Sequence, residues 1–332
     1  MVQNKTDHSP EYKRQLPAAV ADIVRQQVAV GLEVVNDGEF SKVDGFQGYA
    51  RERIDGIEQQ SLAPGVVPPH GTVSERDILQ FPTYHADYAP GGGRGRAGTS
   101  VNRNPNPTVC VGPLHYIGQE AIAADIANLQ AAAAGLDVEL YLPVVSPGNV
   151  EHWLWNQHYP DEESFLSAIA DVLREEYRPI AEAGIVLQID DPDLADGWQM
   201  YPEMEIDEYR RYAALRIEAL NYALRDVPEE LVRLHVCWGS GRGPHANDIP
   251  LADIVDLVLQ VDAECYSVEA ANVRHEHEWQ LWEDVTLPAG KSLMPGVVSH
   301  VTDHIEHPEL VAWRIEAYAN LVGRENVIAG TD

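Results

Sequence analysis

The sequence predicts an α/β fold with a parallel sheet, because segments with helical spacing alternate with short apolar segments along most of its 332 residues. Seven short segments are expected to be buried strands, and each follows a predicted helix. Polar residues stand at the end of every one of them. These observations favour a (β/α)8 barrel, whose strand ends meet at one mouth, over a doubly wound sheet. The glycine fingerprint GxGxxG of the doubly wound fold is missing after the first strand.

The predicted elements run in order from residue 17 to residue 331. A helix is expected at 17–30, between Pro17 and Gly31, and the first strand follows at 32–40. Six further pairs follow, each a helix and then a strand. They are expected at 117–135 with 138–145, 161–183 with 185–191, 206–226 with 231–238, 249–260 with 263–270, 274–285 with 292–299, and 308–323 with 326–331. The strand that should precede the first helix of a (β/α)8 barrel is not in the sequence as given. We expect a single barrel domain over residues 1–332.

Residues 41–113 are expected to form a long insert after the first visible strand, because this stretch is rich in Gly, Pro, Arg and Asn. It contains GGGRGRAG at 91–98, which lacks the GK[ST] ending of a phosphate-binding loop and is not followed directly by a helix. A loop that covers the substrate is the favoured interpretation. The segment TVCVGPL at 108–114 predicts a strand, either of the insert or of the main sheet.

The composition argues against several classes of protein. A net charge of −30 opposes binding to nucleic acid and to anionic membrane surfaces. No apolar run reaches the length of a membrane span, and the first fifteen residues lack the apolar core of a secretory signal. Three cysteines do not suffice for a disulfide framework and fit a reducing cytoplasm.

The motif with the most specific chemistry is the His–x–Cys at the end of the predicted strand 231–238. His235 and Cys237 are two residues apart, so their side chains project from the same face of a strand. Imidazole and thiolate are both good zinc ligands. Glu269 ends the next predicted strand, and a neighbouring strand lies only about 4.8 Å away. The sequence therefore predicts that His235, Cys237 and Glu269 hold one metal ion.

A structural explanation of the same motif stays open, in which a core cysteine stands beside a histidine that hydrogen-bonds to the backbone. The other two cysteines are expected to be structural. Cys265 lies four residues deeper on its strand than Glu269, which is roughly 13 Å, and Cys110 lies in the insert.

Five segments together resemble the catalytic barrel of the cobalamin-independent methionine synthases. They are NDGEF at 36–40, QIDDP at 188–192, HVC at 235–237, VEAAN at 268–272, and PGVVS with HPE within 295–309. The resemblance covers nearly the whole chain and is closest to single-barrel relatives, which include epoxyalkane:coenzyme M transferase. The HxC followed by a strand-ending Glu is fairly specific, whereas the other segments are weak signals when taken singly.

The resemblance implies a zinc enzyme that alkylates a thiol, with His235, Cys237 and Glu269 as zinc ligands. It further implies that Glu39 and Asp190 contact the substrate, with Asp190 among the catalytic candidates. A structural role for Asp190, such as capping a helix, is an equal alternative. In the family, a proton-donating histidine lies in the segment after PGV. In this sequence Val301 stands at that position, and His300 is one position away from it.

The last zinc ligand of the family is a cysteine directly after the final strand, and the sequence stops at Asp332, just before that position. Either the given sequence is clipped at both ends, or the natural protein has lost one ligand and one strand. We expect the first, because a barrel with a gap exposes two unpaired edges.

The implied reaction is methyl or alkyl transfer to a small thiol, as in 5-methyltetrahydrofolate–homocysteine methyl transfer for methionine biosynthesis. The C–S bond formation of epoxyalkane:coenzyme M transferase is the first alternative. A metal-independent barrel of the uroporphyrinogen decarboxylase type, or a barrel that only binds, is the second. The sequence chooses neither the thiol, nor the alkyl donor, nor the oligomeric state.

Overall fold

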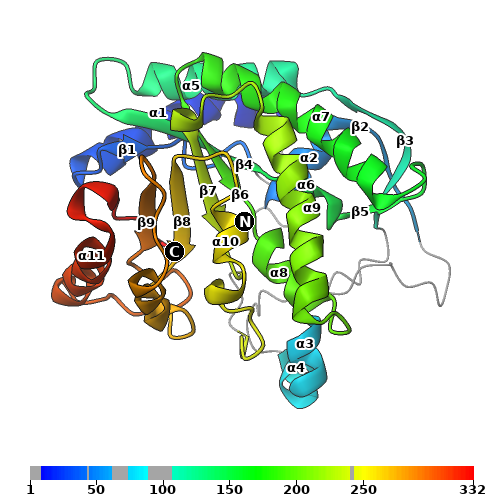
Figure 1. Cartoon of the computed structure of the whole chain (residues 1–332). Helices are drawn as coiled ribbons and strands as arrows, with labels where there is room; N and C mark the ends of the chain where they lie inside the picture. The colour runs from blue at the N-terminus through cyan, green and yellow to red at the C-terminus, as the bar shows by residue number, and fades with distance from the viewer. Residues whose placement is uncertain (1–8, 43–44, 62–73, 89–106, 240–242) are drawn as a thin grey trace. The chain divides into compact units, whose positions relative to one another are not determined.

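The computed structural model describes residues 9–42, 45–61, 74–88, 107–239 and 243–332 (Figure 1). The chain divides into two compact units. Unit 1 consists of residues 1–59, 108–189 and 219–232, and unit 2 consists of residues 60–107, 190–218 and 233–332. The segment GGGRGRAG at 91–98 lies outside the described residues.

The predicted α/β alternation is confirmed. Six strands form a sheet in the order β1-β4-β6-β7-β8-β9, and the pairs β1–β4, β7–β8 and β8–β9 are parallel. Their bounds are β1 (Val34–Val35), β4 (Glu139–Val145), β6 (Val186–Asp190), β7 (Val232–Val236), β8 (Cys265–Glu269) and β9 (Ser292–Gly296). The seventh predicted strand is reduced to two parallel bridges, which join Val327 to Leu293 and Gly330 to Gly296. Every predicted strand segment therefore pairs where the sequence places it.

Unit 1 contains the helices α1 (Pro10–Ala29), α2 (Gly45–Arg53), α5 (Gln119–Ala132), α6 (Pro147–Glu151) and α7 (Glu162–Glu182). The prediction that the first helix begins at Pro17 is wrong, because the helix begins at Pro10. The hydroxyl of Ser9 caps it by accepting a hydrogen bond from the Tyr12 N–H, so Pro17 lies inside the helix. Ser9 followed by Pro10 is a start signal that the apolar spacing alone does not reveal.

A second sheet in unit 1 settles where the segment TVCVGPL belongs. The strand β3 (Thr108–Tyr116) pairs antiparallel with β2 (Ile54–Gln59) and parallel with β5 (Leu154–Asn156). The segment is therefore part of this three-stranded sheet and not of the parallel sheet.

Unit 2 carries the strand ends on which the predicted ligands lie. The strands β7, β8 and β9 lie side by side in it, drawn in yellow and orange in Figure 1, and the helix α11 (Pro308–Val322) follows β9. All five residues of β8 are buried, as expected for a parallel strand that is covered on both faces. The other helices wholly within this unit are α3 (Glu75–Gln80), α4 (Pro82–Tyr88), α8 (Asp193–Met200) and α10 (Val255–Val258). The helix α9 (Ile206–Leu224) begins in it.

Two predicted α-helices of unit 2 are short or tightly wound. The segment 249–260 forms a 3-10 turn η2 (Leu251–Asp253) and the single-turn α10, while 274–285 forms a 3-10 helix η3 (Glu276–Glu283). Short 3-10 turns η1 (Glu229–Leu231) and η4 (Arg324–Asn326) precede β7 and the final bridged segment. In the part of the chain that the structure describes, no helix is long and apolar enough to cross a membrane.

Candidate active site

The register of β7 against β8 brings the predicted ligands to one level. His235 is paired with Ser267, and Val236 with Val268, in the parallel ladder. Cys237, directly after β7, therefore comes level with Glu269, the last residue of β8. This is the arrangement that two-residue spacing on adjacent strands predicts.

His235 is held in a form that can bind a metal. Its Nδ1 lies 3.0 Å from the hydroxyl of Ser267, and its carbonyl accepts a hydrogen bond of 2.8 Å from the Asp191 N–H. Desolvation by the surrounding protein lowers the pKa of His235 to about 4, although the charge of Glu269 opposes the shift. The imidazole is therefore neutral at neutral pH, as metal coordination requires.

The charge of Glu269 acts on the thiol of Cys237, whose sulfur accepts a hydrogen bond of 3.2 Å from the Gly239 N–H. Burial, followed by the negative charges of Glu269 and Asp196, raises the pKa of the Cys237 thiol well above its usual value. Glu269 is 3% exposed and accepts hydrogen bonds from the Trp238 N–H at 2.8 Å and from Asn272 Nδ2 at 2.5 Å. Without a cation, the thiol stays protonated and the carboxylate is held in place.

The residue types at this point fit zinc, because they offer one nitrogen, one sulfur and one oxygen donor. One buried atom also indicates a place for positive charge. Asp332 Oδ2 is buried and has no hydrogen-bond partner among the described residues. Burial raises the pKa of Asp332 to about 7, and the negative charge of Glu269 adds to this shift. A cation here would offset the repulsion between these two acids. As the side chains stand, no three His, Cys, Asp or Glu residues within the described ranges lie close enough together to hold a metal ion.

The other predicted site residues lie at three places. Asp190 ends β6 and is half-buried, and its neighbour Asp191 bonds to the backbone of His235. His300 is exposed in the loop after β9, and its charge contributes to lowering the pKa of His235. Glu39 belongs to unit 1, where it adopts a positive φ of 57° in a turn after β1. The charge of His300 therefore acts on one predicted ligand, His235, whereas Glu39 belongs to the other unit.

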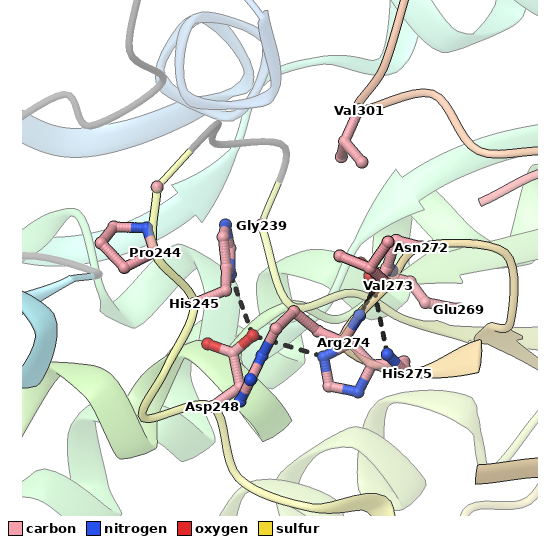
Figure 2. A pocket seen from close by; sticks show the side chains of 11 residues that line it. Gly239, Pro244, His245, Asp248, Glu269, Asn272, Val273, Arg274, His275 and Val301 are labelled. Atoms are coloured by element: carbon pink, nitrogen blue, oxygen red, sulfur yellow. Dashed lines mark hydrogen bonds and ion pairs between the residues drawn. The ribbon is translucent and has the colours of Figure 1, made fainter. Parts of the chain in front are cut away.

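A pocket of about 200 Å³ opens beside Glu269 within unit 2 (Figure 2). One carboxylate oxygen of Asp248 lies 2.9 Å from His245 Nδ1 and 3.3 Å from His275 Nε2. The other ring nitrogen of His275 lies 2.9 Å from Glu278 Oε2. Figure 2 shows Asp248 between the two imidazoles, with dashed lines to both.

His275 is positively charged in this arrangement. Burial would lower its pKa, but the hydrogen bonds to Asp248 and Glu278 outweigh burial and raise the pKa to about 9. His245, Asp248, His275 and Glu278 are not among the site residues predicted from the sequence. Two His–x–x–acid pairs, at 245–248 and 275–278, were the available signal, because residues three apart lie on the same side of a turn or a 3-10 helix.

Known proteins with similar sequences and structures agree on one family. The family model described as "Cobalamin-independent synthase, Catalytic domain" matches residues 148–330, more than half of the chain. A methionine synthase of Pyrococcus abyssi is 25% identical over 185 residues, which are 55% of this chain and 47% of that protein. The 5-methyltetrahydropteroyltriglutamate–homocysteine methyltransferase of Trichodesmium erythraeum is 23% identical over 295 residues, 86% of this chain and 32% of that protein. The chain thus spans about half or less of the length of these two curated relatives.

A solved structure supports the predicted barrel class. The B12-independent methionine synthase from Shewanella sp. W3-18-1, in complex with selenomethionine, matches with a TM-score of 0.69 at 18% identity. The match covers 98% of this chain and 82% of that chain. The fold is therefore an α/β fold consistent with a (β/α)8-type barrel, although the described residues show six of its strands and the bridged segment.

Proposed function

Because this chain belongs to the family of cobalamin-independent synthase catalytic domains, we propose that it transfers a methyl or other alkyl group to the sulfur of a small thiol. His235, Cys237 and Glu269 would hold a zinc ion, which would activate the thiol for this transfer. The observation that carries the proposal is the position of Cys237 against Glu269, level with each other at the ends of β7 and β8 and next to a neutral His235.

Zinc, when bound, lowers the pKa of a coordinated thiol and so supplies a thiolate at neutral pH. The chain's own residues prepare the site for it. Ser267 fixes the ring of His235 through Nδ1 and leaves Nε2 as the metal donor. Trp238 and Asn272 fix the carboxylate of Glu269. The two donors to Glu269 come from the segments that follow β7 and β8.

The remaining predicted residues act on the substrates in this proposal. Glu39 and Asp190 bind polar groups of the thiol substrate, and His300 donates the proton that the departing or opened group of the alkyl donor requires. The reaction belongs in the cytoplasm, where thiols stay reduced, as the free cysteines of the chain do.

Metal analysis combined with a transfer assay tests the proposal. We expect zinc in the purified protein and sulfur alkylation with a methyl or an epoxide donor. His235→Ala and Cys237→Ser should each reduce both zinc content and activity. Cys110→Ala is the matched control, since this buried thiol lies in unit 1 and should leave zinc unchanged. Full zinc occupancy in the His235→Ala/Cys237→Ser double variant would refute the ligand assignment, and a metal-free active enzyme would favour the decarboxylase-like alternative.

A further inference from the structure

His275 contacts both of the residues that hold the carboxylate of Glu269, although the proposed reaction assigns it no role. We propose that His275 is a positioning residue for Glu269, because it fixes the two groups that donate hydrogen bonds to this carboxylate. These groups belong to Trp238 and Asn272. The inference rests on the proposed function, since Glu269 serves there as a ligand of the metal ion. In this role His275 acts on the site without touching a substrate.

The first link between the two side chains is Trp238. Its backbone N–H donates a hydrogen bond of 2.8 Å to Oε1 of Glu269. Its buried indole donates from Nε1 to the carbonyl of Ile249 at 2.7 Å, and the face of the indole lies against the imidazole of His275. Because the ring is held at its nitrogen and at its face, the backbone N–H of Trp238 stays directed at the carboxylate.

The second link is Asn272, in the loop that follows β8. Its Nδ2 donates a hydrogen bond of 2.5 Å to Oε2 of Glu269, and its Oδ1 accepts one of 3.1 Å from the backbone N–H of His275 (Figure 2). The amide group of asparagine is planar, so a partner that fixes Oδ1 also fixes the direction in which Nδ2 donates. Each oxygen of the carboxylate is therefore held by a residue that His275 contacts.

His275 can hold other groups because its own imidazole is held at both nitrogens. Nδ1 lies 2.9 Å from Oε2 of Glu278, and Nε2 lies 3.3 Å from Oδ2 of Asp248. Each acid is anchored through its second oxygen. Glu278 accepts a hydrogen bond of 2.7 Å from the N–H of Leu251, and Asp248 accepts one of 3.1 Å from Gln199. The ring is therefore kept in one orientation, and with it the backbone N–H that bonds to the asparagine.

The direction of the Glu269 carboxylate decides whether it can share a metal ion with the neighbouring strand. Cys237 is level with Glu269 across the β7–β8 ladder. Zinc lies about 2.3 Å from a thiolate sulfur and about 2.0–2.2 Å from a carboxylate oxygen. Rotation of the carboxylate about its side-chain bonds therefore takes the oxygen out of reach of an ion at Cys237. Residues that orient a metal ligand commonly change metal affinity by about 10–100-fold.

NMR of the zinc-free chain measures the position of the carboxylate. The amide proton of Trp238 resonates downfield when it donates to a carboxylate, because a charge-assisted hydrogen bond is short and strong. Glu269→Gln gives the reference without that charged acceptor. We expect His275→Gln to move this resonance most of the way toward the reference. In the same variant, competition with a chelator should show a fall in zinc affinity of about tenfold.

A milder variant covers the case in which His275→Gln does not fold. Glu278→Gln keeps an oxygen for the N–H of Leu251 but withdraws the charged partner of the imidazole. It should move the Trp238 resonance and the zinc affinity in the same directions by smaller amounts.

Two control variants separate positioning from stability. His277→Gln removes an exposed histidine two residues away and should change neither the resonance nor the zinc affinity. Arg53→Met breaks a buried ion pair in unit 1, so it should lower the unfolding midpoint and leave both other quantities as in the wild type. A loss of zinc affinity in Arg53→Met as large as in His275→Gln would assign the effect to lost stability and overturn the inference.

The resonance also separates this inference from the proposed function, because its measurement needs no metal. If the wild-type chain binds no zinc, the proposed function fails, and the Trp238 resonance alone decides whether His275 positions Glu269. If the chain binds zinc, wild-type affinity in both His275→Gln and Glu278→Gln overturns the inference. A Trp238 resonance that stays unchanged in both variants overturns it in either case.

Discussion

The imidazole of His275 lies against the indole of Trp238, with ring centroids 4.3 Å apart and ring planes inclined by 34°. Trp238 directly follows Cys237, so the contact joins the pocket to the strand end with the predicted zinc ligands. The two ring nitrogens of His275 form hydrogen bonds with the carboxylates of Asp248 and Glu278. A buried imidazolium thus sits between two acids and an aromatic face, an arrangement that stabilises the charged form.

The first prediction concerns pH and His275. Its pKa is raised to about 9 in the folded chain, against about 6.5 for an unfolded histidine. The unfolded chain therefore loses this proton at a lower pH than the folded chain. The stabilisation is complete below about pH 6.5 and is lost as the pH rises through about 9. Thermal unfolding between these values should show a falling midpoint temperature.

Substitution identifies the residue that is responsible. His275→Gln should lower stability by about 3 kcal/mol at neutral pH, because two acids lose a charged partner, and should flatten the decline toward high pH. His277→Gln is the matched control, since His277 is exposed two residues away. A variant at 275 that keeps the alkaline decline would assign the effect to another group.

The second prediction concerns Arg53 in unit 1. Its guanidinium donates to Asp125 at 2.6 Å and to Glu176 at 2.8 Å, and all three side chains are buried. Arg53→Met should destabilise the chain by about 3–5 kcal/mol, because it leaves the buried carboxylate of Asp125 without its ion pair and removes a charged donor from the buried Glu176. Urea unfolding measures the loss. Arg178→Ala, which breaks an exposed pair with Glu182, should have far less effect; equal losses in both variants would contradict the argument.

The third prediction concerns His300 as proton donor. His300→Gln should reduce kcat by about 100-fold and leave KM for the thiol nearly unchanged, because proton donation contributes in the transition state and not in binding. The pH profile of kcat should also lose its alkaline limb. His304→Gln, an exposed histidine of the same loop, is the control. If kcat survives in His300→Gln, the exposed histidine affects only the charge around His235.

The strand segments could be predicted closely because buried parallel strands are short apolar runs that carry their own signal. β8 covers Cys265–Glu269, inside the predicted 263–270, and its end residue stands level with Cys237 as the spacing required. The placing of ligand candidates on neighbouring strands follows from the same periodicity. The zinc site itself, and the roles of Glu39, Asp190 and His300, stay predictions.

The segment 274–285 has a helix type that the spacing of its apolar residues does not predict. Apolar periodicity favoured an α-helix, whereas side-chain bonds of Asn272 to two backbone N–H groups and of His275 to Glu278 accompany a 3-10 helix. The Asp248–His275 contact joins residues 27 apart and depends on how two loops meet. Such pairings carry no local period, so the sequence offers the two His–x–x–acid pairs but not the contact that joins them.

The last prediction concerns Arg314, a buried residue of α11 that joins two loops of the site. It donates to the carbonyl of Val297 at 2.9 Å, after β9, and to that of Ala271 at 3.2 Å, after β8. It also forms an ion pair of 2.9 Å with Glu276 and one with Glu306. The loops that carry Asn272 and His300 are therefore held by one guanidinium.

Arg314→Lys should separate positioning from simple stability. A lysine keeps the charge and can pair with an acid, but it cannot donate to both carbonyls in the fixed directions of a guanidinium. We expect zinc affinity, measured by competition with a chelator, to fall by about 10-fold or more, because residues that hold the ligand loops act on the metal indirectly. Arg324→Lys, on the exposed turn after the same helix, should bind zinc as the wild type does. If Arg314→Lys binds zinc with unchanged affinity but has a lower unfolding midpoint, Arg314 only stabilises the fold. If the zinc affinity falls without a matching loss of stability, the two loops must be held together for the site to form.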